Sequence, residues 1–195
     1  VVYNHTAEEG REGPTTVAID EQPGKADAAK IPTLKPAFHP EGTVTAANSS
    51  SISDGAAALV LARESLALAK GLAPRARVVG QASHARAPAW FTTAPVGAIE
   101  ALLARVGWSV GDVDLWEIDE AFAVVAMCAI QDLNLDPDRV NVHGGACALG
   151  HPIGASGARV ITTLLAALER HGLSRGVAAL CIGGGEATAI AIERV

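Results

Sequence analysis

Two glycine-rich segments of the sequence hold most of the residues that could do chemistry. In the first, residues 141–157, His151 lies between Gly150 and Pro152, just before an apolar helical pattern. The positive end of a helix dipole disfavours an imidazolium, so a histidine there is available as a neutral base or hydrogen-bond donor. The alternative is a structural histidine in a tight turn, against which the glycines argue because they let a ligand approach the backbone closely.

The second segment begins with Cys181 and continues through Gly183, Gly184 and Gly185, at the end of an apolar strand pattern. In open α/β sheets, sites gather at that edge of the sheet. Amides freed by the glycines could donate to an oxyanion, and the thiol could be a nucleophile or a proton carrier. A buried cysteine followed by a hairpin turn explains the pattern equally well. If the thiol is reactive, the residues alone predict Cys181 as nucleophile and His151 as its base, a pair suited to acyl transfer.

The apolar periodicity predicts the elements that position these two segments. Strands are expected at residues 56–62, 77–82, 113–118, 140–142, 177–182 and 187–192, and helices at 64–70, 95–106, 121–133 and 155–170. This alternation predicts an α/β fold with a mixed, mostly parallel sheet that has helices on both faces. The last two strands are expected to form an antiparallel pair. The helix at 155–170 is apolar on all sides, so we expect it to be buried between layers, under a second sheet from an upstream part or a partner.

The composition excludes several classes of protein. With 195 residues, of which 49% are apolar and 18% charged, the chain has the composition of one globular core. A net charge of −6 without any basic run argues against a nucleic-acid partner. No segment approaches the roughly 18 apolar residues of a membrane helix, and residues 1–20 have no signal pattern, so we expect a cytoplasmic protein without a membrane partner. The spacing of the cysteines and histidines favours neither a disulfide framework nor a metal site.

Four motifs resemble those of the thiolase family. The stretch Asn141–Gly157 is similar to the signature N-x-x-G-G-x-x-x-x-G-H-P-x-G-x-S-G, and Cys181–Ala189 resembles the family's terminal signature. Gly42–Ala58 and the run Glu120-Ala121-Phe122-Ala123 match two further segments in the right order. The resemblance implies a thiolase-like C-terminal domain over residues 42–195, one half of a layered αβαβα arrangement, preceded by the tail of the loop domain over residues 1–41. It also implies an upstream N-terminal thiolase domain, and a homodimer or homotetramer for the intact protein.

The same resemblance implies an acetyl-CoA C-acyltransferase. Such an enzyme catalyses thiolysis of 3-ketoacyl-CoA, or Claisen condensation of acetyl-CoA, by a ping-pong mechanism, with coenzyme A as substrate and no further cofactor. Thiolases carry the nucleophilic cysteine in the N-terminal half, so we expect this chain alone to be incomplete and inactive. Cys181 then resembles the acid/base that moves the α-proton, not the nucleophile. His151 resembles the residue that activates the nucleophile, and Gly183 the oxyanion-hole amide.

Substrate-binding roles also follow from the resemblance. Ser50 aligns with a serine that touches the pantetheine arm, Ala121 and Phe122 with residues that line its tunnel, and Phe91 lies in the stretch beside the acyl pocket. The bulky side chains of residues 91–94 replace glycines expected there and leave the acyl preference open. They also keep open a thiolase-like enzyme that acts on lipid or steroid acyl-CoA.

Asp119 departs most clearly from the family pattern. It replaces an asparagine that holds a water near the enolate oxygen, and an ionised carboxylate would bring negative charge to where negative charge develops. Because the apolar strand at 113–118 delivers Asp119, we expect the carboxyl to be buried, and then either protonated or ion-paired with His151. On this hypothesis Asp119 impairs catalysis. The departure also supports the alternative of a non-catalytic thiolase-like module for binding or assembly.

Overall fold

The computed structural model describes all residues except 1–2, 6–14, 21, 23 and 25. The chain divides into two units, residues 1–35 and 36–195. Within the first unit, the strands β1 (Tyr3–His5) and β2 (Thr15–Val17) pair antiparallel, and a short 3-10 helix, η1, spans Ile31–Thr33. The predicted loop-domain tail, residues 1–41, falls partly outside the described residues, and its boundary stays a prediction.

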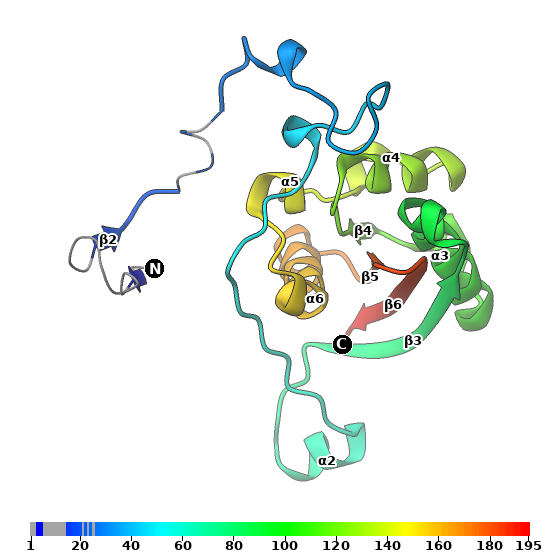
Figure 1. Ribbon diagram of the computed structural model, residues 1–195. Helices are drawn as coiled ribbons and strands as arrows, with labels where there is room; N and C mark the ends of the chain where they lie inside the picture. The colour runs from blue at the N-terminus through cyan, green and yellow to red at the C-terminus, as the bar shows by residue number, and fades with distance from the viewer. Residues whose placement is uncertain (1–2, 6–14, 21, 23, 25) are drawn as a thin grey trace. The chain divides into compact units, whose positions relative to one another are not determined.

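The second unit is built around a four-stranded sheet with the strand order β3-β6-β5-β4. Helices cover both faces of this sheet, so the predicted α/β class and two-sided cover are confirmed (Figure 1). In chain order, the elements are η2 (Ala46–Asn48), α2 (Glu64–Ala69), β3 (Ala76–Ala85), η3 (Pro88–Thr93), α3 (Ala94–Val106), η4 (Val110–Asp112), β4 (Leu115–Ile118), α4 (Ala123–Asp132), η5 (Pro137–Arg139), α5 (Ala146–Leu149), α6 (Ile153–His171), β5 (Arg175–Ile182) and β6 (Glu186–Arg194).

The sheet is mixed as predicted, but the expectation of mostly parallel pairing is wrong. Only β4 and β5 pair in parallel, whereas β6 runs antiparallel to both β5 and β3. A parallel pair needs a crossover, which α4 to α6 supply between β4 and β5. The short turn at 183–185 instead returns the chain directly, so β5 and β6 form the expected antiparallel hairpin, with Cys181 opposite Ala187.

Two predicted strands are not formed. Residues 56–62 have no regular structure, and their largest apolar side chains are exposed, Val60 at 95% and Leu61 at 77%. A strand needs a neighbour for its backbone groups, and in the described part of the chain no named strand pairs with this segment. The predicted strand at 140–142 is reduced to a single parallel bridge between Val140 and Trp116.

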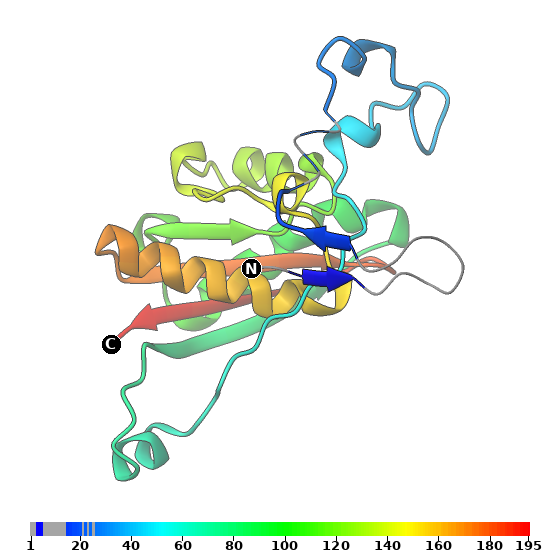
Figure 2. The same cartoon turned by 90° about the vertical axis from the view of Figure 1, so that its left-hand side faces the viewer.

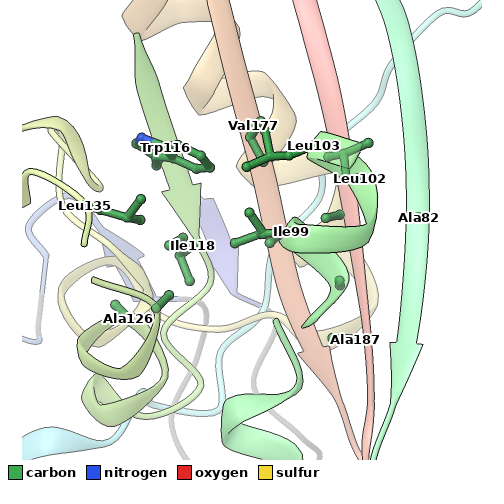
Figure 3. Close-up of a cluster of buried hydrophobic side chains, with 14 of the residues drawn as sticks. Ala82, Ile99, Leu102, Leu103, Trp116, Ile118, Ala126, Leu135, Val177 and Ala187 are labelled. Carbon is green, nitrogen blue, oxygen red and sulfur yellow. The ribbon is translucent and has the colours of Figure 1, made fainter. Parts of the chain in front are cut away.

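The two faces of the sheet pack against different helices, α3 on one and α6 on the other (Figures 1 and 2). Successive strand residues point to opposite faces, so Trp116 and Ile118 of β4 face α3 while Leu115 lies in the cluster around α6. The α3 face is a continuous apolar core (Figure 3) that includes Ala82, Ile99, Leu102, Leu103, Trp116, Ile118, Val177 and Ala187.

Helix α6 closely matches its predicted range and ends where Gly172 adopts a left-handed conformation, with φ 67°. Val160, Leu164 and Leu168 are buried against the sheet. The predicted burial on every side is not reached within this chain, because Thr162 and Ala166, on the side of the helix opposite the buried stripe, are exposed. A covering layer from another domain therefore stays a prediction. Within the described residues, no helix has the length and apolar character needed to span a membrane.

Candidate active site

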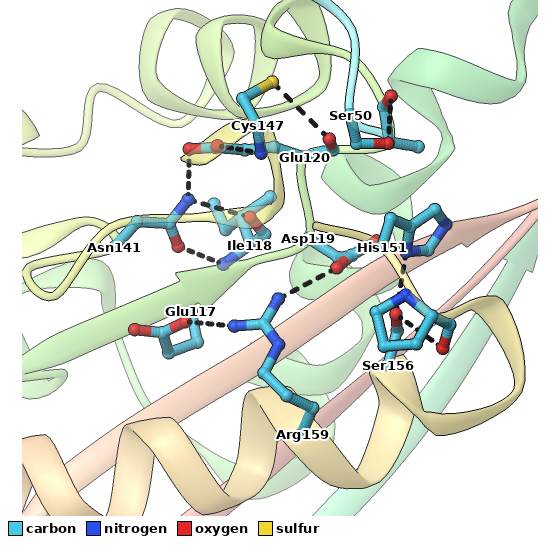
Figure 4. A network of polar contacts seen from close by, with 12 residues as sticks. Ser50, Glu117, Ile118, Asp119, Glu120, Asn141, Cys147, His151, Ser156 and Arg159 are labelled. Carbon is cyan, nitrogen blue, oxygen red and sulfur yellow. Dashed lines mark hydrogen bonds and ion pairs between the residues drawn. The ribbon is translucent and has the colours of Figure 1, made fainter. Parts of the chain in front are cut away.

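Asp119 follows directly after β4, and its amide still donates to Ala179 O across the sheet, at 2.9 Å. The predicted burial is confirmed, since only 1% of the residue is exposed. Its two carboxylate oxygens have different neighbours (Figure 4). Arg159 Nη2 donates to Oδ1 at 3.1 Å, and His151 Nδ1 lies 3.2 Å from Oδ2. The carboxyl thus lies between a guanidinium and an imidazole.

His151 lies just before α6, as the sequence predicts, and its backbone amide donates to Ser51 O at 3.0 Å. On its side chain, Nδ1 is 2.7 Å from Ser156 Oγ. The Ser156 hydroxyl donates to Pro152 O at 3.2 Å, so its oxygen accepts a hydrogen bond from Nδ1–H. The proton therefore belongs on Nδ1, and the lone pair of Nε2 is left to accept another.

Arg159 also reaches a second buried carboxylate. Its Nη1 lies 3.6 Å from Glu117 Oε2, and the Glu117 side chain is 2% exposed. Burial raises the pKa of Glu117 to about 7, while Arg159 acts against this shift. Burial likewise raises the pKa of Asp119, opposed by the charges of His151 and Arg159. One permanent cation is thus shared between two buried acids.

The glycine-rich segment is fixed to β4 by Asn141, which has a left-handed φ of 49°. The Asn141 side chain pairs with the backbone of Ile118, accepting from its N–H at 2.8 Å and donating to its carbonyl at 2.9 Å. Asn141 Nδ2 also donates to Glu120 Oε1 at 2.7 Å. The Glu120 carboxylate fills the space that a Cβ at Gly145 would occupy, because that Cβ would lie 2.2 Å from Glu120 Cδ. A side chain at position 145 would therefore displace the Glu120 carboxylate from its hydrogen bonds with Asn141 Nδ2 and the Cys147 amide.

Cys181 is the penultimate residue of β5, just before the hairpin turn. It is buried in the core, with 9% of its surface exposed. Burial, followed by the negative charge of Asp119, raises the pKa of the Cys181 thiol to about 11. The thiol is thus protonated at neutral pH. Gly183, two residues further on, lies exposed in the turn.

The four residues implied in substrate binding come together around one aromatic cluster. Ser50 Oγ donates to Ala121 O at 2.9 Å. The rings of Phe91 and Phe122 meet edge to face, with centroids 6.1 Å apart. Phe38 packs against Phe122 in the same manner at 5.6 Å, a contact that the sequence analysis missed. The structure therefore brings segments around residues 50, 91 and 121 to one place.

Three residues of the charged cluster were not singled out from the sequence: Glu117, Ser156 and Arg159. The available signal was charge in an apolar context, since Glu117 interrupts an apolar strand and Arg159 follows Ser156 by three residues on the same helix face. Cys147 is half-buried, and burial raises the pKa of its thiol to about 11. Among the side chains that the structure describes, no group of three His, Cys, Asp or Glu is placed to hold a metal ion.

Comparison with known proteins identifies the family. Residues 72–194 match the family described as "Thiolase, C-terminal domain", and residues 6–65 match "Thiolase, N-terminal domain". The cytosolic acetyl-CoA acetyltransferase of Mus musculus is 48% identical over 187 residues, which cover 94% of this chain and 47% of the mouse protein. The acetyl-CoA acetyltransferase of Bacillus anthracis superposes with a TM-score of 0.89 at 42% identity, covering 100% of this chain and 49% of that structure.

A second similar structure is the Acat5 thiolase from Ascaris suum in complex with coenzyme A, with a TM-score of 0.81 at 42% identity; the match covers 92% of this chain and 47% of the Ascaris chain. The chain spans less than half the length of the curated relatives that it matches. The family matches extend over most of the sequence, including the glycine-rich segments of the site. The chain belongs to the thiolase family.

Proposed function

We propose that this chain supplies the C-terminal part of the active site of an acetyl-CoA C-acyltransferase, which cleaves 3-ketoacyl-CoA or condenses acetyl-CoA. The observation that carries the proposal is the pair of contacts that His151 makes through Nδ1. Ser156 and Asp119 occupy its Nδ1 side, so Nε2 is free to take a proton from a nucleophile. The nucleophilic cysteine itself would come from the N-terminal half of a thiolase.

The reaction then proceeds in two half-reactions. In the thiolysis direction, His151 takes the proton of the nucleophilic cysteine, whose sulfur attacks the 3-keto carbon. The bond between the 2- and 3-carbons breaks, the acyl group stays on the cysteine, and the electron pair goes to the 2-carbon of acetyl-CoA. A second molecule of coenzyme A then takes the acyl group by thioester exchange. Condensation is the same sequence reversed.

Cys181 suits the proton transfer at the 2-carbon. A carbanion or enolate needs a proton donor that is itself protonated at neutral pH, and the raised pKa of about 11 keeps the Cys181 thiol in that form. The backbone N–H of Gly183, in the open turn beside it, is the proposed donor to the thioester oxygen. The segments of Ser50, Ala121, Phe122 and Phe91 would line the path of the acyl-CoA.

The main test is a chimera in which this chain follows the N-terminal half of the Bacillus anthracis acetyl-CoA acetyltransferase. We expect the chimera to cleave acetoacetyl-CoA with coenzyme A and the 195-residue chain alone to be inactive. The complete Bacillus enzyme is the positive control. A chimera that folds and binds coenzyme A without any turnover would support the non-catalytic module instead. Turnover by the isolated chain, with an acyl group trapped on Cys181, would make Cys181 the nucleophile.

Two substitutions in the active chimera separate the roles of the side chains. His151→Ala is expected to slow both acylation and condensation, by about 10²–10⁴-fold for the loss of a general base. Cys181→Ala is expected to accept an acyl group but to lose deuterium exchange at the 2-carbon of acetyl-CoA. Exchange that persists at the normal rate without Cys181 would rule out its role as acid/base.

The subcellular location and the oligomeric state of the protein are part of the same proposal. The name of the mouse relative supports a cytosolic location, and the resemblance to thiolases supports a homodimer or homotetramer. Fractionation of the source cells and light scattering of the intact protein test these two points. Beyond coenzyme A as substrate, the proposed reaction needs no cofactor.

A further inference from the structure

Asp119 creates an electrostatic problem for the base proposed above, and this inference rests on that proposed function. An ionised carboxylate 3.2 Å from His151 Nδ1 favours the imidazolium, which has no lone pair to take the nucleophile's proton. A protonated Asp119 would avoid this, but it would leave the Arg159 guanidinium without an ionised partner at 3.1 Å. The geometry contains a third solution, in which the guanidinium offsets the charge of the carboxylate.

We propose that Arg159 is a positioning residue that acts through Asp119, neutralising its carboxylate so that His151 keeps a neutral ring with the proton on Nδ1. The two oxygens of Asp119 contact different groups. Oδ1 accepts from the guanidinium at 3.1 Å, which leaves Oδ2 facing the imidazole at 3.2 Å. Helix α6 provides both supports of the histidine system, because Ser156 and Arg159 are separated by three residues and lie on one helix face.

The surroundings leave Arg159 without a substitute. The groups that face Asp119 and His151 come from every neighbouring element: Glu117 from β4, Glu120 just beyond it, Cys147 from α5 and Cys181 from β5. These groups are acids or thiols. Among the described residues whose charge acts on Asp119, Arg159 is therefore the one permanent cation.

Burial makes this compensation strong. The side chains of Asp119, Glu117 and Arg159 are 0%, 2% and 18% exposed, so water screens their charges weakly. Glu117 competes for the same guanidinium, with its Oε2 at 3.6 Å from Nη1, but the contact with Asp119 is shorter and is a hydrogen bond. Removing Glu117 therefore leaves the pair between Arg159 and Asp119 in place, which provides a matched control.

The test reads the protonation of His151 directly and needs no catalysis. In the 195-residue chain labelled with ¹⁵N in its histidine rings, ring-nitrogen chemical shifts give both the tautomer and the protonated fraction at pH 7. The chain has six histidines, and His151→Gln identifies the signals of interest by their loss. For the natural sequence we expect a neutral ring with the proton on Nδ1.

Arg159→Met is expected to raise the ratio of protonated to neutral His151 at pH 7 by about tenfold, the smaller end of the effect of an uncompensated neighbouring charge. Glu117→Gln is expected to produce no such increase. The charge-balanced double variant Glu117→Gln/Arg159→Met loses one acid and one base together, so it remains informative if Arg159→Met alone does not fold. Compared with Glu117→Gln, it is expected to show the same increase.

An unchanged protonated fraction and tautomer in the folded double variant would overturn the inference and leave Arg159 a structural ion-pair partner. In the active chimera, the acid limb of the pH–rate profile is expected to move to higher pH in Arg159→Met and to return most of the way in Arg159→Lys. Because the chemical shifts do not depend on acyl transfer, they distinguish failure of this inference from failure of the proposed function.

Discussion

The two faces of the sheet differ in what they bury, although the same strands form both. The α3 face is apolar throughout, from Ala82 on β3 to Trp116 on β4. The α6 face is apolar along Leu164 and Leu168, but near the end of β4 it buries Glu117 and Asp119 around Arg159. Apolar packing fixes the elements at little electrostatic cost, whereas the buried charges are held at the end of the sheet where the candidate site lies. The buried charges thus lie on the α6 face, whereas the proposed acid/base Cys181 belongs to the apolar cluster on the α3 face, so the candidate site uses residues from both.

The sharpest contrast comes from removing the shared cation. Arg159→Met removes the guanidinium that two buried carboxylates share and is expected to lower the free energy of unfolding by about 3–5 kcal/mol at pH 8. At pH 5 the loss is expected to be smaller, because Glu117 can then take up a proton. Urea unfolding at both pH values measures the difference. An equal loss at both would mean that the buried charges do not determine the stability of this face.

The apolar face is tested by a truncation in its centre. Leu102→Ala, on a side chain with no exposed surface, is expected to cost about 2–5 kcal/mol. Unlike the loss of Arg159, this cost is expected to be the same at pH 5 and pH 8. Leu68→Ala on α2 is the matched control, because Leu68 is 68% exposed. A cost at Leu102 no larger than that at Leu68 would contradict the assignment of the core.

Glu117 gives the charged face a distinctive pH dependence. Its pKa in the folded chain is raised from an ordinary 4.5 to about 7, so the folded state holds a proton that the unfolded state releases in this range. Its contribution is therefore complete below about pH 4.5 and is lost as the pH rises through 7. Relative to Glu117→Gln, the natural chain should lose roughly 3 kcal/mol of stability between pH 4 and pH 8. If the free energies of unfolding of the two proteins changed equally with pH over this range, the raised pKa of Glu117 would be refuted.

The smallest effects are expected from glycine substitutions at positions where α3 and α6 lie close to the sheet. A Cβ at Gly80 would lie 2.5 Å from Val106 Cγ1 of α3, and one at Gly176 would lie 2.7 Å from Leu164 Cδ1 of α6. Gly80→Ala and Gly176→Ala are each expected to cost about 1–3 kcal/mol by overpacking. Gly154→Ala on α6 meets nothing within 4 Å and is expected to be neutral or stabilising. Thermal unfolding of the three variants checks this order.

Local patterns were sufficient to predict several of these features. The apolar spacing of α3, the Gly172 stop of α6 and the burial of Asp119 after an apolar strand all depend on neighbours in the sequence, and the structure confirms them. The family motifs also identified His151, whose contact with Asp119 the structure provides.

Features that depend on distant partners were missed. Arg159 reaches Asp119 because of the rotation of α6 over the sheet, which the sequence pattern does not specify. The prediction of a mostly parallel sheet failed because the alternation of strands and helices along the sequence does not reveal that β6 lies between β5 and β3. Residues 56–62 have a strand-like composition but no pairing strand in the described part of the chain, and they fall within the match to the N-terminal thiolase domain.

The position of β6 in the sheet constrains the order of folding. This strand is the last element in the chain, yet it lies between β3 and β5 and pairs Ala76 with Arg194. During synthesis on the ribosome, β3 therefore has no pairing strand, and the apolar side of α3 is incompletely covered, until β6 has been translated. Such long-range pairing slows folding and leaves apolar surface exposed to aggregation in the meantime. The nascent domain should thus depend on chaperones more than its final packing suggests.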